Sequence, residues 1–174
     1  MYTLGLDISS SKIGIALLKD DKIVISEVVK FKPNQPLEER AIKFESRMRE
    51  IEQHYVVYDL YVEQPAMMFR GGKTTAYTMA TLQRFNGMCC YALRKVFDMT
   101  PVLVNPRSAR SKLNIKTPRG MANKEVKRFI IENVEKRFNG QFKYNMTHKG
   151  NPQPGTDDRA DAIVVALAGP LLNN

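Results

Sequence analysis

Apolar and small residues alternate along short segments at the start of the chain. Three such segments predict strands: Tyr2 to Ile8, Ile13 to Lys19 and Ile23 to Phe31. The turn-forming sequence Lys19-Asp-Asp-Lys22 separates the second from the third. Because the segments are short and follow one another directly, we expect them to pair as a three-stranded antiparallel meander.

A helical pattern begins after the prolines that end this meander. Five apolar residues recur at intervals of three or four and share one face of a helix: Leu37, Ala41, Phe44, Met48 and Ile51. The rest of the chain predicts the strands Tyr58 to Glu63 and Pro101 to Asn105, and the helices Thr75 to Phe97, Asn123 to Phe138 and Asp157 to Leu172. A meander followed by alternating strands and helices predicts an α/β fold, in which a mixed sheet is flanked by helices.

Two segments are typical of loops, Phe69 to Lys73 and Tyr144 to Thr156. The second contains Asn151-Pro-Gln-Pro-Gly155, which is too polar and too rich in proline and glycine for a core. Thr156 is a candidate N-cap for the last helix.

Composition narrows the class of protein. The 174 residues, 43% of them hydrophobic, are enough for one core, so we expect a single domain over residues 1–174. A net charge of +9 favours a polyanionic partner or an anionic membrane surface. Neither a membrane-spanning run nor a secretory signal pattern is present, so the sequence indicates a cytoplasmic protein that binds nucleic acid. The adjacent Cys89 and Cys90 lack metal-ligand spacing and are expected to be buried thiols.

Acidic residues interrupt three apolar elements. Asp7 lies in the first predicted strand, Glu63 ends the fourth, and Asp157, Asp158 and Asp161 open the last helix. Each alone has an ordinary explanation, as a turn residue, a strand end or a partner of the helix dipole. Carboxylates gathered from distant segments repel one another unless a cation joins them, and oxygen ligands suit Mg²⁺ or Mn²⁺. Helix geometry lets either Asp157 or Asp158 act together with Asp161.

Basic residues are concentrated between residues 107 and 128. Glu125 is the one acid there, against eight cations: Arg107, Arg110, Lys112, Lys116, Arg119, Lys124, Lys127 and Arg128. This imbalance favours phosphate binding over a solvated helix face. The loop Met67-Met-Phe-Arg-Gly-Gly-Lys73 is a second candidate, because Arg70 and Lys73 could meet phosphates while Phe69 wedges against an unstacked base. A flexible lip with one exposed aromatic explains that loop equally well.

These motifs resemble those of a known family. Asp7 in GLDISSSKIGIAL, Glu63 in YVEQP and Asp158-Arg-Ala-Asp161-Ala162 are similar to the four-acid pattern of RuvC-type Holliday junction resolvases, which belong to the RNase H-like nuclease superfamily. The resemblance covers nearly the whole chain and implies an RNase H-like sheet of five strands, three antiparallel and then parallel. It also matches Lys124 to a lysine that opens the penultimate helix.

The resemblance implies a structure-selective endonuclease that resolves four-way DNA junctions as a homodimer. Asp7 would bridge two Mg²⁺ ions, for which Mn²⁺ could substitute, and Glu63 and Asp161 would each complete one. The D-x-x-D spacing favours Asp158 as the fourth ligand. Lys124 would neutralise the scissile phosphate. The helix from Thr75 to Phe97 could supply the dimer contact or be a buried core helix.

The sequence departs from the family pattern in three places. Arg110 stands where the family commonly has a lysine, Asp157 is an additional acid, and the interval before Phe69 is longer. Lys12, beside Asp7, is a candidate contact to the DNA backbone or an ordinary turn residue. If the protein is phage-encoded, its compartment is the host cytoplasm.

Other classes of protein share parts of these signals. A nuclease of the same superfamily that acts on RNA–DNA hybrids would carry the same acids. A non-catalytic DNA-binding relative would not need them. The opening Asp7-Ile-Ser-Ser-Ser-Lys12 also resembles the phosphate-binding start of actin-like ATPases and sugar kinases, but those proteins duplicate the domain, and 174 residues leave no room for a second copy.

Overall fold

The computed structural model describes residues 1–20, 22–65 and 75–173. Its strands are β1 (Tyr2–Ile8), β2 (Lys12–Lys19), β3 (Lys22–Lys30), β4 (Val57–Glu63) and β5 (Val102–Val104). They form one sheet in the order β3-β2-β1-β4-β5. The first three strands pair antiparallel, and β4 and β5 then join β1 in parallel. The predicted mixed five-stranded sheet is therefore confirmed.

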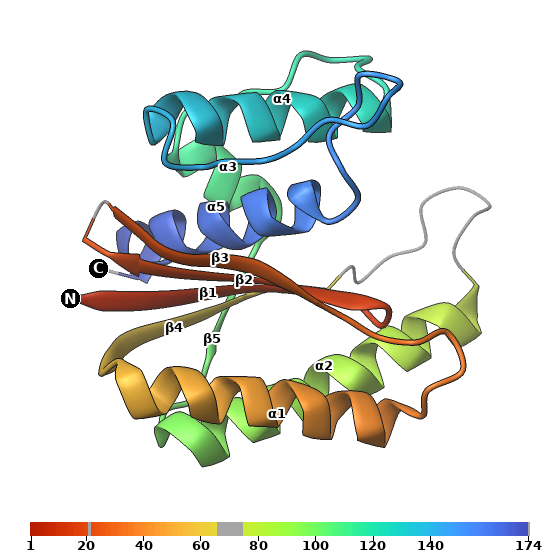
Figure 1. The fold of residues 1–174 in the computed structure, drawn as a ribbon, viewed down its shortest axis with the longest axis vertical. Coiled ribbons are helices and arrows are strands. Elements are labelled where there is room, and N and C mark those ends of the chain that lie inside the picture. The colour runs from red at the N-terminus through yellow and green to blue at the C-terminus, as the bar shows by residue number, and fades with distance from the viewer. Residues whose placement is uncertain (21, 66–74, 174) are drawn as a thin grey trace.

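Helices cover both faces of the sheet (Figure 1). On one face lie α1 (Leu37–His54) and α2 (Ala76–Phe97), and on the other lies α5 (Thr156–Asn173). The helices α3 (Pro106–Lys112) and α4 (Asn123–Arg137) pack on α5, away from the strands. Within the described ranges, the structure holds no helix that is long and apolar enough to cross a membrane.

The helix α3 was not predicted, because seven residues are too few to display an apolar period. Its start is nevertheless encoded locally. Pro106 takes the first helical position, and the Asn105 side chain accepts hydrogen bonds from the N–H groups of Arg107 and Ser108, at 3.0 and 3.2 Å. The sequence Asn105-Pro106 therefore begins a helix immediately after β5.

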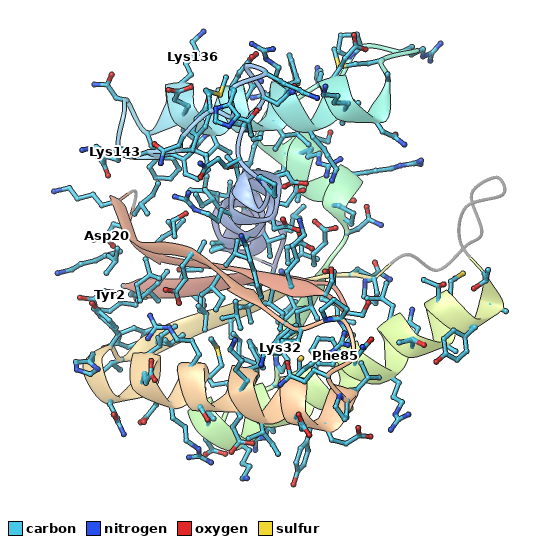
Figure 2. The ribbon with its side chains drawn as sticks, turned by 45° about the vertical axis from the view of Figure 1, so that its right-hand side comes forward. Tyr2, Asp20, Lys32, Phe85, Lys136 and Lys143 are labelled. Atoms are coloured by element: carbon cyan, nitrogen blue, oxygen red, sulfur yellow. The ribbon has the colours of Figure 1, made fainter. Side chains whose placement is uncertain are left out.

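The face of the sheet under α1 and α2 is built from large side chains. Leu4 and Leu6 of β1 pack with Phe44 of α1 and Phe85 of α2, all fully buried. Phe85 lies between α2 and the sheet, with its ring edge-on to Phe31 at 5.6 Å between centroids (Figure 2). This layer is an ordinary apolar core, in which side chains set the separation of helix and sheet.

The face under α5 has small residues where the helix crosses β1 and β2. A Cβ atom added to Gly5 of β1 would lie 2.4 Å from the carbonyl oxygen of Ala162, and one added to Gly14 of β2 would lie 2.1 Å from that of Asp158. Both distances are far inside van der Waals contact. The backbone of α5 therefore rests directly on β1 and β2, and only glycine fits at these two positions.

Two local expectations are wrong. Cys89 is buried as expected, but Cys90 is only half-buried. Thr156 does not cap α5 with its side chain. It is the first residue of the helix, and its hydroxyl donates to the carbonyl of Gln153 at 2.7 Å. Gly155, with φ of 101°, precedes it and offers its carbonyl to the N–H of Arg159.

Candidate active site

The alternation of the strands brings Asp7 and Glu63 to the same face of the sheet as α5. Gly5 contacts α5, so Asp7, two residues later, projects toward the same helix. Tyr61 of β4 contacts Gly169 of α5, which places Glu63 on that face in the same way. Because β1 and β4 are parallel neighbours in which Leu6 pairs with Val62, the two acids lie side by side where both strands end.

The first turns of α5 add the aspartates. Asp158 is buried, with 7% of its surface exposed, and its backbone lies over Gly14, the residue that pairs with Asp7 across the β1–β2 ladder. Asp161 follows three residues later and shares that side of the helix. The structure thus brings together the predicted acids Asp7, Glu63, Asp158 and Asp161.

Burial and mutual repulsion act strongly on the two strand acids. Burial, followed by the negative charges of Glu63, Asp161 and Asp158, raises the pKa of Asp7 well above its usual value. The pKa of Glu63 rises to about 8, first through burial and then through Asp161, while Arg110 partly opposes the rise. The acids of the three elements are therefore close enough to interact, and Asp7 is surrounded by negative charge.

Cations of the protein itself pair with the acids of α5. The Arg110 guanidinium donates to Oδ1 of Asp161 at 3.0 Å. The Lys12 ammonium contacts Oδ2 of Asp158 and lies 3.8 Å from Asp157. Lys12, predicted as a contact to DNA, thus lies within the acid cluster.

The structure separates the roles of Asp157 and Asp158. Burial raises the pKa of Asp157, but its pairing with Lys127 at 2.5 Å and with Lys12 outweighs burial, and the net pKa lies below the usual value. Burial is also the largest influence on Asp158, and there it prevails over Lys12, so the pKa of that carboxyl is raised. Asp157 is thus an ionised partner of lysines, whereas Asp158 belongs to the buried cluster.

The donor chemistry of the cluster fits a divalent metal. Four carboxylates supply oxygen ligands, and Asp158 Oδ2 is buried without a regular hydrogen bond although it contacts the Lys12 ammonium. Among the residues that the structure describes, however, no three acidic, histidine or cysteine side chains are grouped closely enough to hold an ion. Two of the carboxylates are drawn instead toward Arg110 and Lys12. The acids are therefore clustered but held by cations of the chain.

The basic residues predicted from the sequence lie on α3, on the connection that follows it and on α4. Arg107 and Lys112 are exposed on α3, and Lys116 and Arg119 are exposed in the connection to α4. Lys124 lies in the first turn of α4 and lines a cavity that also contacts Asp157. The predicted DNA contacts Phe69, Arg70 and Lys73 fall outside the described residues.

Sequence reasoning missed two contributors to the site. One is Gly14, whose missing side chain admits Asp158. The spacing of Asp7 and Gly14 around a tight turn was a usable signal, because residues that flank a hairpin pair with one another. The other is the contact of Lys127 with Asp157. Its position three residues after Lys124 places both lysines on one side of α4.

No protein-family model and no curated protein matches the sequence. Solved structures do match. RuvC of Thermus thermophilus in complex with a Holliday junction substrate is 20% identical, with a TM-score of 0.66 over 97% of this chain and 91% of that one. A second structure of Thermus thermophilus RuvC is 22% identical, with a TM-score of 0.63 over 97% and 92%. A yeast mitochondrial Holliday junction resolvase is 17% identical, with a TM-score of 0.57 over 94% and 75%. The chain therefore has the RNase H-like fold of RuvC.

Proposed function

We propose that this protein is a metal-dependent endonuclease that cuts branched DNA and resolves four-way junctions. One observation carries the proposal: in a RuvC-type fold, Asp7, Glu63, Asp158 and Asp161 converge from β1, β4 and α5 onto one site. Two structural neighbours are Holliday junction resolvases by name or by bound substrate. The exposed arginines and lysines of α3 and the following connection supply the charge that a DNA backbone requires.

The four acids would hold two divalent ions, Mg²⁺ in the cell and Mn²⁺ as a substitute. Bound there, such ions supply an activated water and positive charge for the in-line hydrolysis of a phosphodiester. Asp7 would lie between the other ligands, because β4, which carries Glu63, is the neighbour of its strand, and α5, which carries Asp158 and Asp161, packs over it. Asp158 is preferred to Asp157 as the fourth ligand, since Asp157 already pairs with Lys127.

The cations of the site have separate tasks. Lys124, which has an exposed ammonium beside the cluster, would bind the scissile phosphate and offset the charge that develops on it. Arg110 holds Asp161 in place and reduces the repulsion between Asp161 and Glu63. With five N–H donors, its guanidinium would be able to hold Asp161 and bind a phosphate at the same time.

Symmetric cutting of a four-way junction requires two sites related by a two-fold axis, so we further propose a homodimer. The outward side of α2 offers a surface for it, because Tyr77 and Tyr91 are 81% and 71% exposed there. We also propose that residues 1–174 form one nuclease domain that acts in the cytoplasm.

A cleavage assay tests the function. The purified protein is incubated with four-way junction, Y-fork, duplex and RNA–DNA hybrid, with and without Mg²⁺. We expect cutting of the junction alone or far faster than the others, and only with metal. Glu63→Gln should abolish it, whereas Asp59→Asn, on the same strand but at its other end, should not. Preferred cutting of the hybrid would replace the junction with an RNA-containing substrate, and absence of cutting on every substrate would refute the proposal.

A further inference from the structure

The segment from Asn151 to Pro154 takes no part in the acid cluster, yet it forms one wall of a cavity beside it. The cavity has a volume of about 420 Å³ and lies between this segment and the first turns of α4. Asp157, the neighbour of the candidate ligand Asp158, also lines it. A cavity of this size is large enough for one nucleotide.

The α4 wall of the cavity is basic. Lys124, Lys127 and Arg128 line it, and the two nearby acids are already engaged. Glu125 accepts a hydrogen bond from the N–H of Ala122 at 2.9 Å, and Asp157 pairs with Lys127. Within the described part of the chain, the Lys124 side chain makes neither a hydrogen bond nor an ion pair. This wall therefore favours an anionic ligand.

The opposite wall is apolar and carries amides. Pro152 and Pro154 present apolar surfaces, and Ile131 on the α4 wall adds a further apolar side chain. Asn151 and Gln153 alternate with the prolines and contribute side-chain amides. Apolar surfaces suit the face of a nucleobase, while an amide offers the donor and acceptor that match a base edge. Inorganic phosphate would need neither feature.

Hydrogen bonds hold the amide wall in one conformation. The N–H of Thr147 donates to the carbonyl of Asn151 at 2.7 Å, and the N–H of Gln153 donates to that of Asn145 at 2.9 Å. Met146 and Pro152 form an isolated antiparallel bridge. These bonds fix the backbone from which the two amides project, so only the side chains need to be ordered on binding.

We propose that this cavity binds one nucleotide of the strand that is cut, next to the scissile phosphate. Lys124 and Lys127 bind its phosphate, the prolines contact the face of its base, and Asn151 and Gln153 read the base edge. The proposal rests on the nuclease function proposed above and adds to it the residues that set a cleavage-sequence preference.

The test is a four-way junction library with randomised bases around the branch point, cut in Mg²⁺ and sequenced at the new ends. We expect the wild-type protein to prefer one base by about tenfold at a position that flanks the cut. Asn151→Ala and Gln153→Ala should reduce this preference to about twofold or less. Cleavage of the preferred sequence should fall by about fivefold, toward the rate of the other sequences, because the lost amide contacts favoured only that base.

Asn145→Ala is the matched control, since Asn145 is an exposed amide of the same segment and does not line this cavity. It should keep the wild-type profile. The proposal is wrong if the wild-type protein cuts without a base preference, if the cavity variants keep the wild-type profile, or if Asn145→Ala flattens it as much as they do. A wild-type protein that leaves every junction intact would instead overturn the nuclease function, and the nucleotide site with it.

Discussion

The two faces of the sheet contact their helices in opposite ways. Under α1 and α2, large side chains such as Leu6, Phe44 and Phe85 fill the space between helix and strand. Under α5, the absence of side chains at Gly5 and Gly14 lets the helix backbone touch the strands. On the first face, stability depends on how well large side chains fill the space between helix and sheet. On the second face, the position of the acids depends on two glycines that have no side chain.

This contrast explains where the carboxylates are tolerated. Close backbone contact fixes Asp158 and Asp161 relative to Asp7, and the end of the sheet leaves room for Arg110 and Lys12 to pair with them. On the other face, the residues of β1 that alternate with Asp7 are Leu6 and Ile8, both buried among apolar side chains. An acid there would be buried among apolar side chains, which disfavours its charged form.

The largest expected effect separates activity from stability on the α5 face. Asp7→Asn should lower cleavage by about a thousandfold or more, because it removes the charge proposed to hold both metal ions. Without metal, the Asp7→Asn variant should be at least as stable as the wild type, since Asn carries no charge that is repelled by Glu63 and Asp161. Thermal melting in a chelator measures the stability, and single-turnover cleavage of a junction measures the activity. Loss of stability together with activity would make Asp7 a structural residue.

The next effect distinguishes neighbouring acids on the same helix. Asp158→Asn should eliminate cleavage, whereas Asp157→Asn should leave most of it and cost at most about 1 kcal/mol through the lost interaction with the helix dipole and Lys127. Cleavage across a Mg²⁺ titration decides between them. An inactive Asp157 variant beside an active Asp158 variant would move the fourth ligand by one residue.

On the opposite face the effect should fall on stability alone. Phe44→Ala removes a fully buried ring between α1 and the sheet and should cost about 3–5 kcal/mol of unfolding free energy. Urea denaturation measures that loss. Cleavage per folded molecule at low temperature should stay near the wild-type value, so a large loss of specific activity would show that the two faces are coupled.

Gly14→Ala should disturb both properties at once. The new methyl group would overlap the backbone of Asp158, which should cost about 1–3 kcal/mol or more and displace that carboxylate. Gly87→Ala is the control, because Gly87 is an exposed glycine of α2 with open space around its Cα. It should raise stability by about 0.5–1 kcal/mol without changing cleavage. Normal cleavage by a stable Gly14→Ala variant would contradict the close packing of α5.

The last effect depends on pH and should be confined to the α5 face. The pKa of Glu63 is about 8 in the folded protein and is near its ordinary value, about 4.3, when unfolded, so the folded state binds the additional proton. Stability without metal should therefore fall as pH rises from about 4.5 to about 8, by at most about 1.4 kcal/mol per pH unit, and level off above that range. Melting in chelator should show the slope, and Glu63→Gln should reduce it. A stability that rises over this range would contradict the burial and mutual repulsion of Asp7 and Glu63.

Strand positions were predictable because period-two patterns determine which side chains face a helix. The boundaries of β1 match the prediction, and the acids that end β1 and β4 were identified from the same patterns. Pairings between distant segments were not predictable. The contact of Lys12 with Asp158 depends on α5 lying across β2, which no local pattern encodes. The role of Gly14 is of the same kind, since a missing side chain has meaning only once its neighbour is known.

The docking of α5 onto β1 and β2 also determines when the acids come together during synthesis of the chain. Ribosomes make the first hairpin, with Asp7 and Lys12, well before they make Asp158 and Asp161. The growing chain therefore contains the acids of the strands before those of α5 are made. Until then, the face of the hairpin that carries the glycines is not covered by α5. The proposed active site would therefore form only when α5 docks on the sheet.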